Sequence, residues 1–322
     1  RMTSSYYPIH EKHGFDASEY AEKIDRALRG DKETVAKLLV DINNTQRQKV
    51  KEPYQIRYGK ELKVALDKKF SGDAEKLILA LIQTPLEYDL EQIDKAMAGL
   101  GTDENTLIEI ICSRTPDQLK AITAHYDKKN PNKPLAKAIA GDTSGEFKDL
   151  LIALVNGSKD AGHSTNDAEA HDDAVRLFAD GKGKFKGTKE GSHFLHILAT
   201  QNMYQLRKVF AEFEKLSGAN IEKAITKEFS GDLRKAYLTI VGATVNKQKF
   251  FAEQLRDSMK GLGTDENSLI RVIVARSEVD LNLIKEEFLL MHEGKKTLEA
   301  AIKGDTSGVF RDTLLAIIAG NQ

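Results

Sequence analysis

The apolar residues of this chain recur at the spacing of one buried helix face. After Gly145, five of them fall at positions i, i+3, i+4, i+7 and i+8: Phe147, Leu150, Leu151, Leu154 and Val155. The same stripe occurs in the segments 77–82, 233–241 and 310–318. Only 6 prolines interrupt the 322 residues. The pattern therefore predicts an all-helical chain.

A Ser-Gly pair precedes each stripe and divides the chain into four similar units. The glycines of these pairs, at intervals of 73, 86 and 77 residues, are Gly72, Gly145, Gly231 and Gly308. The first and third units share the string FSGD, whereas the second and fourth share GDTSG and GLGTDEN. This pairing suggests that a block of two units was doubled. Units of this length hold about five helices each, more than the two-helix modules of solenoids.

The repeat pattern also predicts where the parts of the chain begin and end. Residues 157–171 are rich in Gly, Ser, Asp, Asn and His and show little periodicity, which is typical of a solvated connector. We predict an N-terminal tail at 1–16, a first repeat at 17–88, a second at 89–156, the connector at 157–171, a third repeat at 172–246 and a fourth at 247–322.

The composition of the chain limits which partners and which cellular compartment are expected. Lys and Arg number 48 against 49 Asp and Glu, so the formal net charge of −1 gives no general attraction to nucleic acid. The longest apolar runs, such as Leu150 to Val155, reach about a third of the roughly 20 residues that cross a bilayer. The sole cysteine, Cys112, excludes an internal disulfide, and the polar stretch from Met2 to Phe15 lacks the apolar core of a secretory signal. We expect a cytoplasmic protein that meets membranes only at their surface.

Two loops in each unit carry the residues that could perform chemistry. One reads MAGLGTDEN from Met97 and MKGLGTDEN from Met259, and the other reads GDTSG in both copies. Two glycines separated by one residue let the backbone turn tightly and expose carbonyl oxygens. The glycine turn and the acid of GDTSG are 41 residues apart in the second unit and 42 in the fourth. Nearly equal spacing is expected where the two loops close on one point.

The cation that fits such a point is calcium. Calcium accepts several oxygen ligands at loosely constrained angles, including peptide carbonyls and a bidentate carboxylate, whereas magnesium requires a strict octahedron. Three carbonyls and one carboxylate leave coordination positions of the calcium ion open. They supply one negative charge against the two positive charges of the ion. A phosphate oxygen of a lipid headgroup could complete the sphere.

Each loop alone is explained equally well as a helix connection. Thr of GLGTDEN would then be an N-cap, and the acid of GDTSG would only complement a helix dipole. The binding interpretation is favoured because the two loops occur together twice and degenerate together once. The degenerate case is the first unit, which reads ALRGDKETV and has Lys69 where the acid is expected. The third unit has a longer loop, DGKGKFKGT, and Glu228 follows its Gly187 by 41 residues.

With these motifs, the sequence from about Ala17 to Gly320 resembles the annexins, a family of calcium-dependent phospholipid-binding proteins with four homologous repeats. The family pattern of Gly, any residue, Gly-Thr and, about 40 residues later, Asp or Glu occurs in full twice and in altered form once. The resemblance implies an all-helical fold with five helices per repeat, arranged as a slightly curved disc whose convex face carries the calcium loops.

The resemblance also implies a ligand set for each calcium ion. In the second repeat it comprises the carbonyls of Met97, Gly99 and Gly101 and the carboxylate of Asp142. In the fourth it comprises those of Met259, Gly261 and Gly263 with Asp305. In the third it comprises those of Gly183, Phe185 and Gly187 with Glu228. The first repeat departs from the pattern, so we expect no ion there.

Residues at the loop tips are expected to contact the membrane. Leu100 and Leu262 lie between the glycines, and the third loop places Phe185 between Lys184 and Lys186. Apolar tips could enter the interfacial zone while lysines meet anionic headgroups, each contributing about 1 kcal/mol. The alternative is that the leucines fold back onto the protein and the lysines belong to a solvated turn.

The sequence therefore predicts a reversible, calcium-switched protein that binds anionic phospholipid membranes. The alternative is a calcium-independent helical scaffold, followed by an ion-conducting protein with charges at Asp89, Glu109, Arg114 and Arg276. Such charges form ion pairs more often than a conduction path. No nucleophile elbow, zinc-protease motif or complete phosphate-binding loop indicates an enzyme. Self-association on membranes and a partner for the tail are left open.

Overall fold

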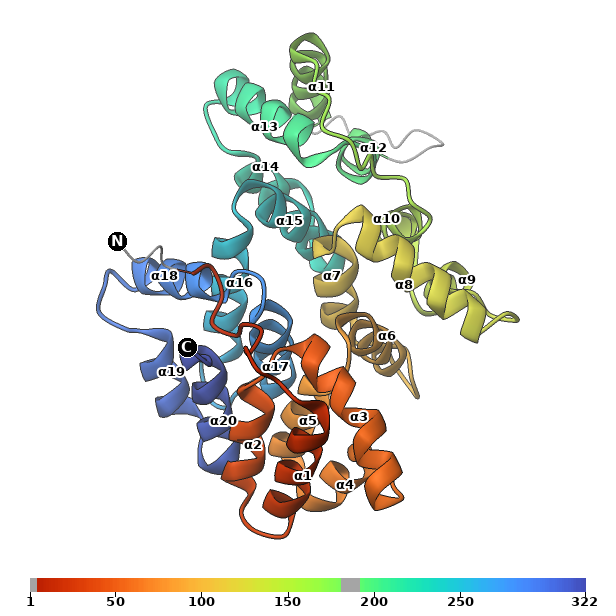
Figure 1. Cartoon of the computed structure of the whole chain (residues 1–322). Helices are drawn as coiled ribbons and strands as arrows, with labels where there is room; N and C mark the ends of the chain where they lie inside the picture. The colour runs from red at the N-terminus through yellow and green to blue at the C-terminus, as the bar shows by residue number, and fades with distance from the viewer. Residues whose placement is uncertain (1–4, 181–191) are drawn as a thin grey trace. The chain divides into compact units, whose positions relative to one another are not determined.

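The computed structural model describes residues 5–180 and 192–322, and within these ranges it contains helices and connecting segments but no strand (Figure 1). The first repeat comprises α1 (Ala17–Leu28), α2 (Lys32–Val40), α3 (Asn44–Tyr58), α4 (Leu62–Lys69) and α5 (Gly72–Leu81). The second comprises α6 (Pro85–Ala96), α7 (Glu104–Ser113), α8 (Pro116–Lys129), α9 (Leu135–Asp142) and α10 (Gly145–Val155). The third comprises α11 (Asp167–Asp180), α12 (His193–Thr200), α13 (Met203–Ser217), α14 (Ile221–Glu228) and α15 (Gly231–Val245). The fourth comprises α16 (Lys247–Ser258), α17 (Glu266–Arg276), α18 (Leu281–Met291), α19 (Leu298–Asp305) and α20 (Gly308–Ala319).

The all-helical prediction with five helices per repeat is confirmed. Each predicted stripe lies on the last helix of its repeat, and all five apolar residues of the α10 stripe are buried. The Ser-Gly pair recurs because each of these helices begins at a glycine with a left-handed φ: 61° at Gly72, 63° at Gly145, 60° at Gly231 and 63° at Gly308. Other residues rarely adopt that conformation. Helix α11 begins at Asp167, inside the segment predicted as the connector.

The first and fourth repeats form one compact unit, made of the chain up to Tyr88 and of Gln248–Gln322. Within it, α2 packs on α20, and α5 packs on both α17 and α20 (Figure 1). Their buried apolar residues form one continuous core that includes Leu39, Leu81 and Leu314. Helices that are far apart in the sequence therefore stabilise each other in this unit.

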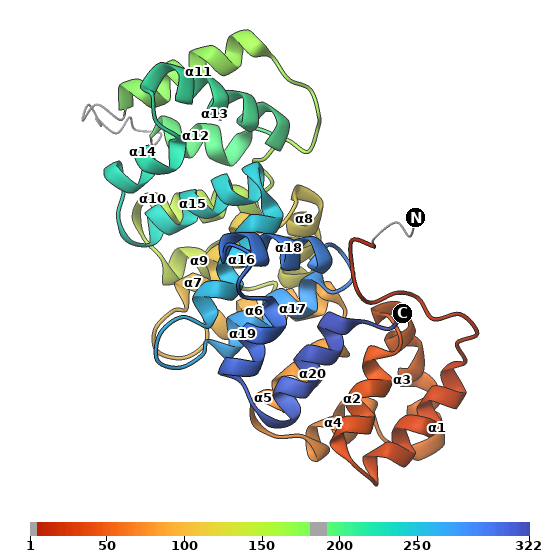
Figure 2. The same cartoon turned by 90° about the vertical axis from the view of Figure 1, so that its left-hand side faces the viewer.

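The second and third repeats form the other compact unit, Asp89–Lys247. Here α7 packs on α15, α10 packs on α12, and α11 packs on α13 (Figure 2). In the described ranges, every helix falls short of the length and apolar character needed to cross a bilayer.

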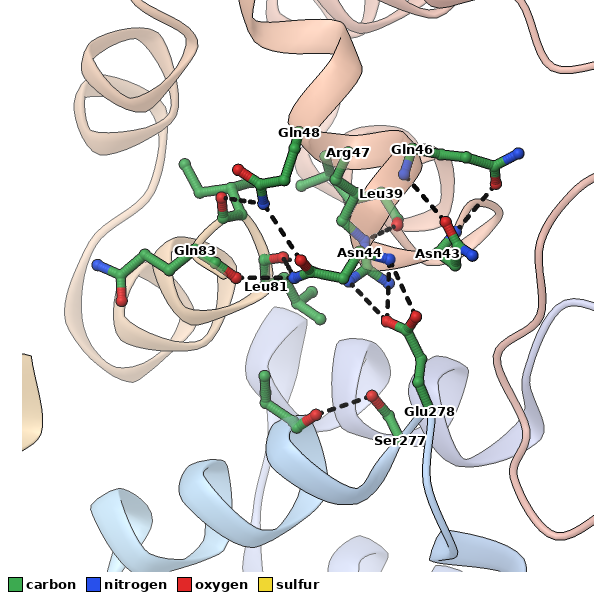
Figure 3. Close-up of polar contacts among 12 residues, drawn as sticks. Leu39, Asn43, Asn44, Gln46, Arg47, Gln48, Leu81, Gln83, Ser277 and Glu278 are labelled. Carbon is green, nitrogen blue, oxygen red and sulfur yellow. Dashed lines mark hydrogen bonds and ion pairs between the residues drawn. The ribbon is translucent and has the colours of Figure 1, made fainter. Parts of the chain in front are cut away.

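A buried ion pair joins the two repeats of the first unit (Figure 3). The Arg47 side chain, 1% exposed, donates hydrogen bonds to the carbonyls of Leu39 (2.6 Å) and Leu81 (3.2 Å), and its Nη1 lies 3.6 Å from Oε2 of Glu278. The Glu278 carboxylate also accepts from the Asn44 amide, with its Oε2 at 2.9 Å. Burial lowers the pKa of Arg47 to about 10 and raises that of Glu278. The fourth repeat thus supplies the anion for a buried cation of the first.

The segment predicted as an N-terminal tail packs against the fourth repeat where the structure describes it. The Tyr6 carbonyl accepts from the Asn282 amide at 3.0 Å, and the Ile9 amide donates to the Ser277 carbonyl at 3.2 Å. Ile9 is fully buried and belongs to the core of the unit. Residues from Tyr6 to Ile9 are therefore part of the folded unit.

Candidate metal sites

The glycine loop of the second repeat is a closed turn between α6 and α7. The Asp103 amide donates to the Ala96 carbonyl at 2.8 Å, which brings the two ends of the loop together. Gly99 and Gly101 have φ angles of 78° and 94°, a conformation that nearly requires glycine. The Leu100 side chain between them is fully exposed, at 107% of its reference area.

The loop of the fourth repeat has the same construction. The Asp265 amide donates to the Ser258 carbonyl at 2.7 Å, and Gly261 and Gly263 have φ angles of 94° and 95°. Leu262 is 109% exposed. Two segments 162 residues apart therefore adopt one conformation, as their shared sequence predicts.

The acid of GDTSG lies beside the glycine loop in both repeats. Thr102 Oγ1 lies 3.3 Å from Oδ2 of Asp142 and 3.4 Å from its carbonyl oxygen. Thr264 Oγ1 donates to the Asp305 carbonyl at 3.2 Å. Asp142 and Asp305 are the last residues of α9 and α19. The structure thus brings together the two loops that their nearly equal spacing predicts to be neighbours.

The donor groups at these two places fit a hard cation that accepts peptide oxygens. Among residues 5–180 and 192–322, no group of three His, Cys, Asp or Glu side chains could hold a metal. A metal at either loop would therefore need backbone carbonyls in addition to one carboxylate. Calcium accepts such a set, whereas zinc prefers several nitrogen or sulfur side chains.

The first repeat carries a cation of its own at the corresponding position. Lys69 ends α4 as Asp142 ends α9, and its Nζ donates to the Gly30 carbonyl at 2.8 Å. Gly30 precedes Asp31, the N-cap of α2, whose carboxylate accepts from the Thr34 amide at 2.7 Å. An ammonium group at this carbonyl repels a second cation. The structure therefore gives a physical reason to expect no calcium ion in the first repeat.

The third repeat is described only in part. The predicted loop residues Gly183, Lys184, Phe185, Lys186 and Gly187 lie outside the described residues. Glu228 is described: it ends α14, as Asp142 and Asp305 end their helices. The acid of this repeat thus has the same place in its repeat as the other two.

Sequence reasoning missed two features of the sites. The N-cap of α7 is Asp103, whose carboxylate accepts from the Thr106 amide at 3.1 Å, and Asp265 caps α17 in the same way. Thr102 and Thr264, considered as caps, instead contact Asp142 and the backbone carbonyl of Asp305, respectively. The Thr-Asp pair contained both signals, because Asp caps a helix at least as well as Thr.

Three of the four charged residues considered for a conduction path, Asp89, Arg114 and Arg276, form ion pairs within their own unit. Arg114 binds Asp89 through two hydrogen bonds of 2.9 Å in the second unit. Arg276 binds Asp280 at 2.7 and 2.6 Å in the first unit. Both pairs are largely buried, so these charges have local structural partners.

Comparison with known proteins identifies similar sequences and folds. The family model described as Annexin matches residues 15–81, 88–154, 182–240 and 250–317. Human annexin A13 is 40% identical over 308 residues, covering 95% of this chain and 96% of the relative. The solved structure of annexin III has a TM-score of 0.90 at 36% identity and covers 99% of this chain and 100% of its own. The calcium-bound structure of annexin (Sm)1 has a TM-score of 0.84 at 27% identity and covers 98% and 94%, respectively.

Proposed function

Because the chain belongs to the annexin family, we propose that it binds anionic phospholipid membranes reversibly through calcium ions. The observation that carries this proposal is the contact between the glycine loop and the acidic residue: Thr102 with the Asp142 carboxylate, and Thr264 with the backbone carbonyl of Asp305. It recurs in two repeats that share the loop sequence. The similar annexin (Sm)1 is calcium-bound in its solved structure, which supports the choice of ion.

The proposed ligands are the carbonyls of each glycine loop together with the acid beside it. In the second and fourth repeats they are Met97, Gly99, Gly101 and Asp142, and Met259, Gly261, Gly263 and Asp305. In the third repeat the proposed set is Gly183, Phe185, Gly187 and Glu228, of which only Glu228 lies within the described residues. When bound, calcium would supply a positive centre that a lipid phosphate can complete.

Two leucines would add an apolar contact with the bilayer. Leu100 and Leu262 are fully exposed at the tips of the loops, so they do not fold back onto the protein. Transfer of one leucine side chain from water to an apolar environment contributes about 1.5–3 kcal/mol when complete. Lys184 and Lys186, proposed to meet headgroups from the third loop, lie outside the described residues.

Calcium and membrane then strengthen each other's binding. If lipid phosphate completes the coordination of the ion, the membrane raises the affinity for calcium by the same factor by which calcium raises the affinity for the membrane. A net charge of −1 leaves little attraction between the calcium-free protein and an anionic surface. The protein would therefore leave the membrane when calcium falls.

Sedimentation with phosphatidylserine vesicles tests the proposal. We expect the protein to pellet with vesicles in calcium and to return to the supernatant when a chelator is added. Vesicles of phosphatidylcholine alone serve as the neutral control and should retain little protein. Equal pelleting with calcium and with chelator would instead favour a calcium-independent scaffold.

Lys69→Ala tests the assignment of the first repeat. We expect the calcium concentration for half-maximal vesicle binding to stay nearly unchanged. Any shift should be smaller than roughly fivefold, because one lysine near an anionic surface contributes about 1 kcal/mol to membrane binding. No calcium ion is lost, because the ammonium of Lys69 already lies on the Gly30 carbonyl. A larger effect than that of losing Asp142 and Asp305 would show that the wrong repeat had been assigned as inactive.

A further inference from the structure

A cavity of about 220 Å³ lies inside the second unit and shares no residue with the calcium loops. It is lined by the end of α7 and the start of α8, the segment 159–163, the start of α13, the end of α15 and the first residue of α16. Its polar lining includes Lys159, Asp160, Asn202 and Lys247. The proposed membrane function uses none of these side chains.

Lys159 lines this cavity with a charge that nothing nearby neutralises. Its ammonium donates one hydrogen bond, to the Leu198 carbonyl at 3.5 Å, the outer limit for such a bond. In the described part of the chain, no carboxylate lies within the 4.0 Å of an ion pair with it. The pKa of Lys159 is lowered to about 8, mainly by burial and to a smaller extent by the positive charge of Lys247. The group still carries its proton at neutral pH.

Neither acidic residue of the cavity, Asp117 or Asp160, pairs with Lys159. The Asp160 carboxylate accepts from Asn202 Nδ2 and from the Gly162 amide, each at 2.8 Å. Asp117 is exposed on α8. Arg114, a further cation of the lining, is bound by Asp89. The cavity therefore has an unmatched positive charge at Lys159, and an anion would satisfy it.

The rest of the lining limits the size and character of such an anion. Pro116, Ile240 and Ala243 are apolar, and His163 stacks on Tyr204 with ring centroids 5.2 Å apart. The thiol of Cys112 is neutral, because burial raises its pKa to about 12. The volume is below the roughly 300 Å³ at which pockets for drug-sized ligands begin. It suits one acidic group on a compact apolar body.

We propose that this cavity binds a small organic anion, a phosphate monoester or a carboxylate, with the Lys159 ammonium as its main polar contact. The acidic group replaces the long hydrogen bond of Lys159 by a charge-assisted one, and the apolar body lies against Pro116, Ile240 and Ala243. Binding needs no calcium, because none of the proposed calcium ligands lines the cavity.

Calorimetric titration of the full chain with phenyl phosphate tests this site. A chelator is present throughout, so that no calcium ion can bridge the phosphate. We expect saturable binding in the millimolar range that ligands of this size reach. Lys159→Met should weaken it by about 10- to 100-fold, the effect of losing a hydrogen bond to a charged group. Benzoate tests the carboxylate form of the ligand, and neutral phenol should bind much more weakly than either anion.

Lys120→Met is the matched control, because Lys120 is exposed on α8 and does not line the cavity. It should bind phenyl phosphate like the unmodified protein. Equal binding by the Lys159→Met variant, or no saturable binding by the unmodified protein, would overturn the proposal. Phenyl phosphate should also slow reductive methylation of Lys159 in the unmodified chain, a measurement that depends on no variant, and lack of protection would count against the site. Both variants should retain calcium-dependent vesicle binding.

Discussion

Joint replacement of Asp142 and Asp305 by alanine is expected to raise the calcium concentration for half-maximal vesicle binding by about tenfold or more, because each site loses a charged ligand whose interaction contributes about 1.5–3 kcal/mol. These acids end α9 and α19, beside Thr102 and Thr264 of the glycine loops. The measurement is sedimentation with phosphatidylserine vesicles over a series of buffered calcium concentrations.

Single variants and a control separate loss of a ligand from loss of surface charge. Asp142→Ala and Asp305→Ala alone should give smaller shifts, since one intact site remains in each. Asp149→Ala removes an exposed carboxylate at the fifth residue of α10, the helix that follows the acid, and should leave the calcium requirement unchanged. If the double variant bound vesicles with the calcium requirement of the Asp149→Ala control, the proposed ligand sets would be wrong.

The helices could be predicted from sequence because their signals are local. The α10 stripe repeats with the period of one helix face, and all its residues are buried in the structure. The repeated Ser-Gly pair marks a helix start, because its glycine adopts a φ near +60° in every repeat. Neither feature depends on which helices pack together.

The meeting of loop and acid could also be predicted, because the chain contains nearly the same spacing twice. Nearly equal separations imply similar geometry, and the contacts of Thr102 and Thr264 with Asp142 and Asp305 agree with this expectation. The partner of Lys69 could not be predicted in this way. Its contact with Gly30 belongs to the first repeat, whose loop has no second copy in the chain.

Packing between distant repeats had no sequence signal. The first and fourth repeats share a core through α2, α5, α17 and α20, although more than 150 residues separate the two halves of that unit. From a single sequence one cannot tell which helix packs against which when several helices carry similar apolar stripes. The same holds for Lys159, whose cavity is lined by residues from four other parts of its unit.

The ion pair between these repeats leads to the second large effect: Glu278→Ala should lower the free energy of unfolding of the first unit by about 3 kcal/mol, the lower end of the range for removing one partner of a buried pair. The lower end applies because the Glu278 side chain is still 27% exposed. Arg47 would remain buried as an uncompensated cation. Even in the unmodified protein its polar atoms are not fully satisfied, because Nη2 has no hydrogen-bond partner in the described structure. Urea unfolding followed by far-ultraviolet circular dichroism measures the change.

Two variants identify the physical origin of that loss. Glu278→Gln keeps an oxygen that can accept from the Asn44 amide but removes the charge that faces Arg47, so its destabilisation isolates the ionic part of the interaction. Glu293→Ala removes an exposed glutamate that pairs with the exposed Lys295, a contact expected to contribute less than about 1 kcal/mol. Equal stability of the Glu278→Ala and Glu293→Ala variants would show that the buried cation does not depend on its anion. If the Glu278→Gln variant were as unstable as Glu278→Ala, the effect would be due to charge. The fourth repeat would then stabilise the first through the negative charge of Glu278.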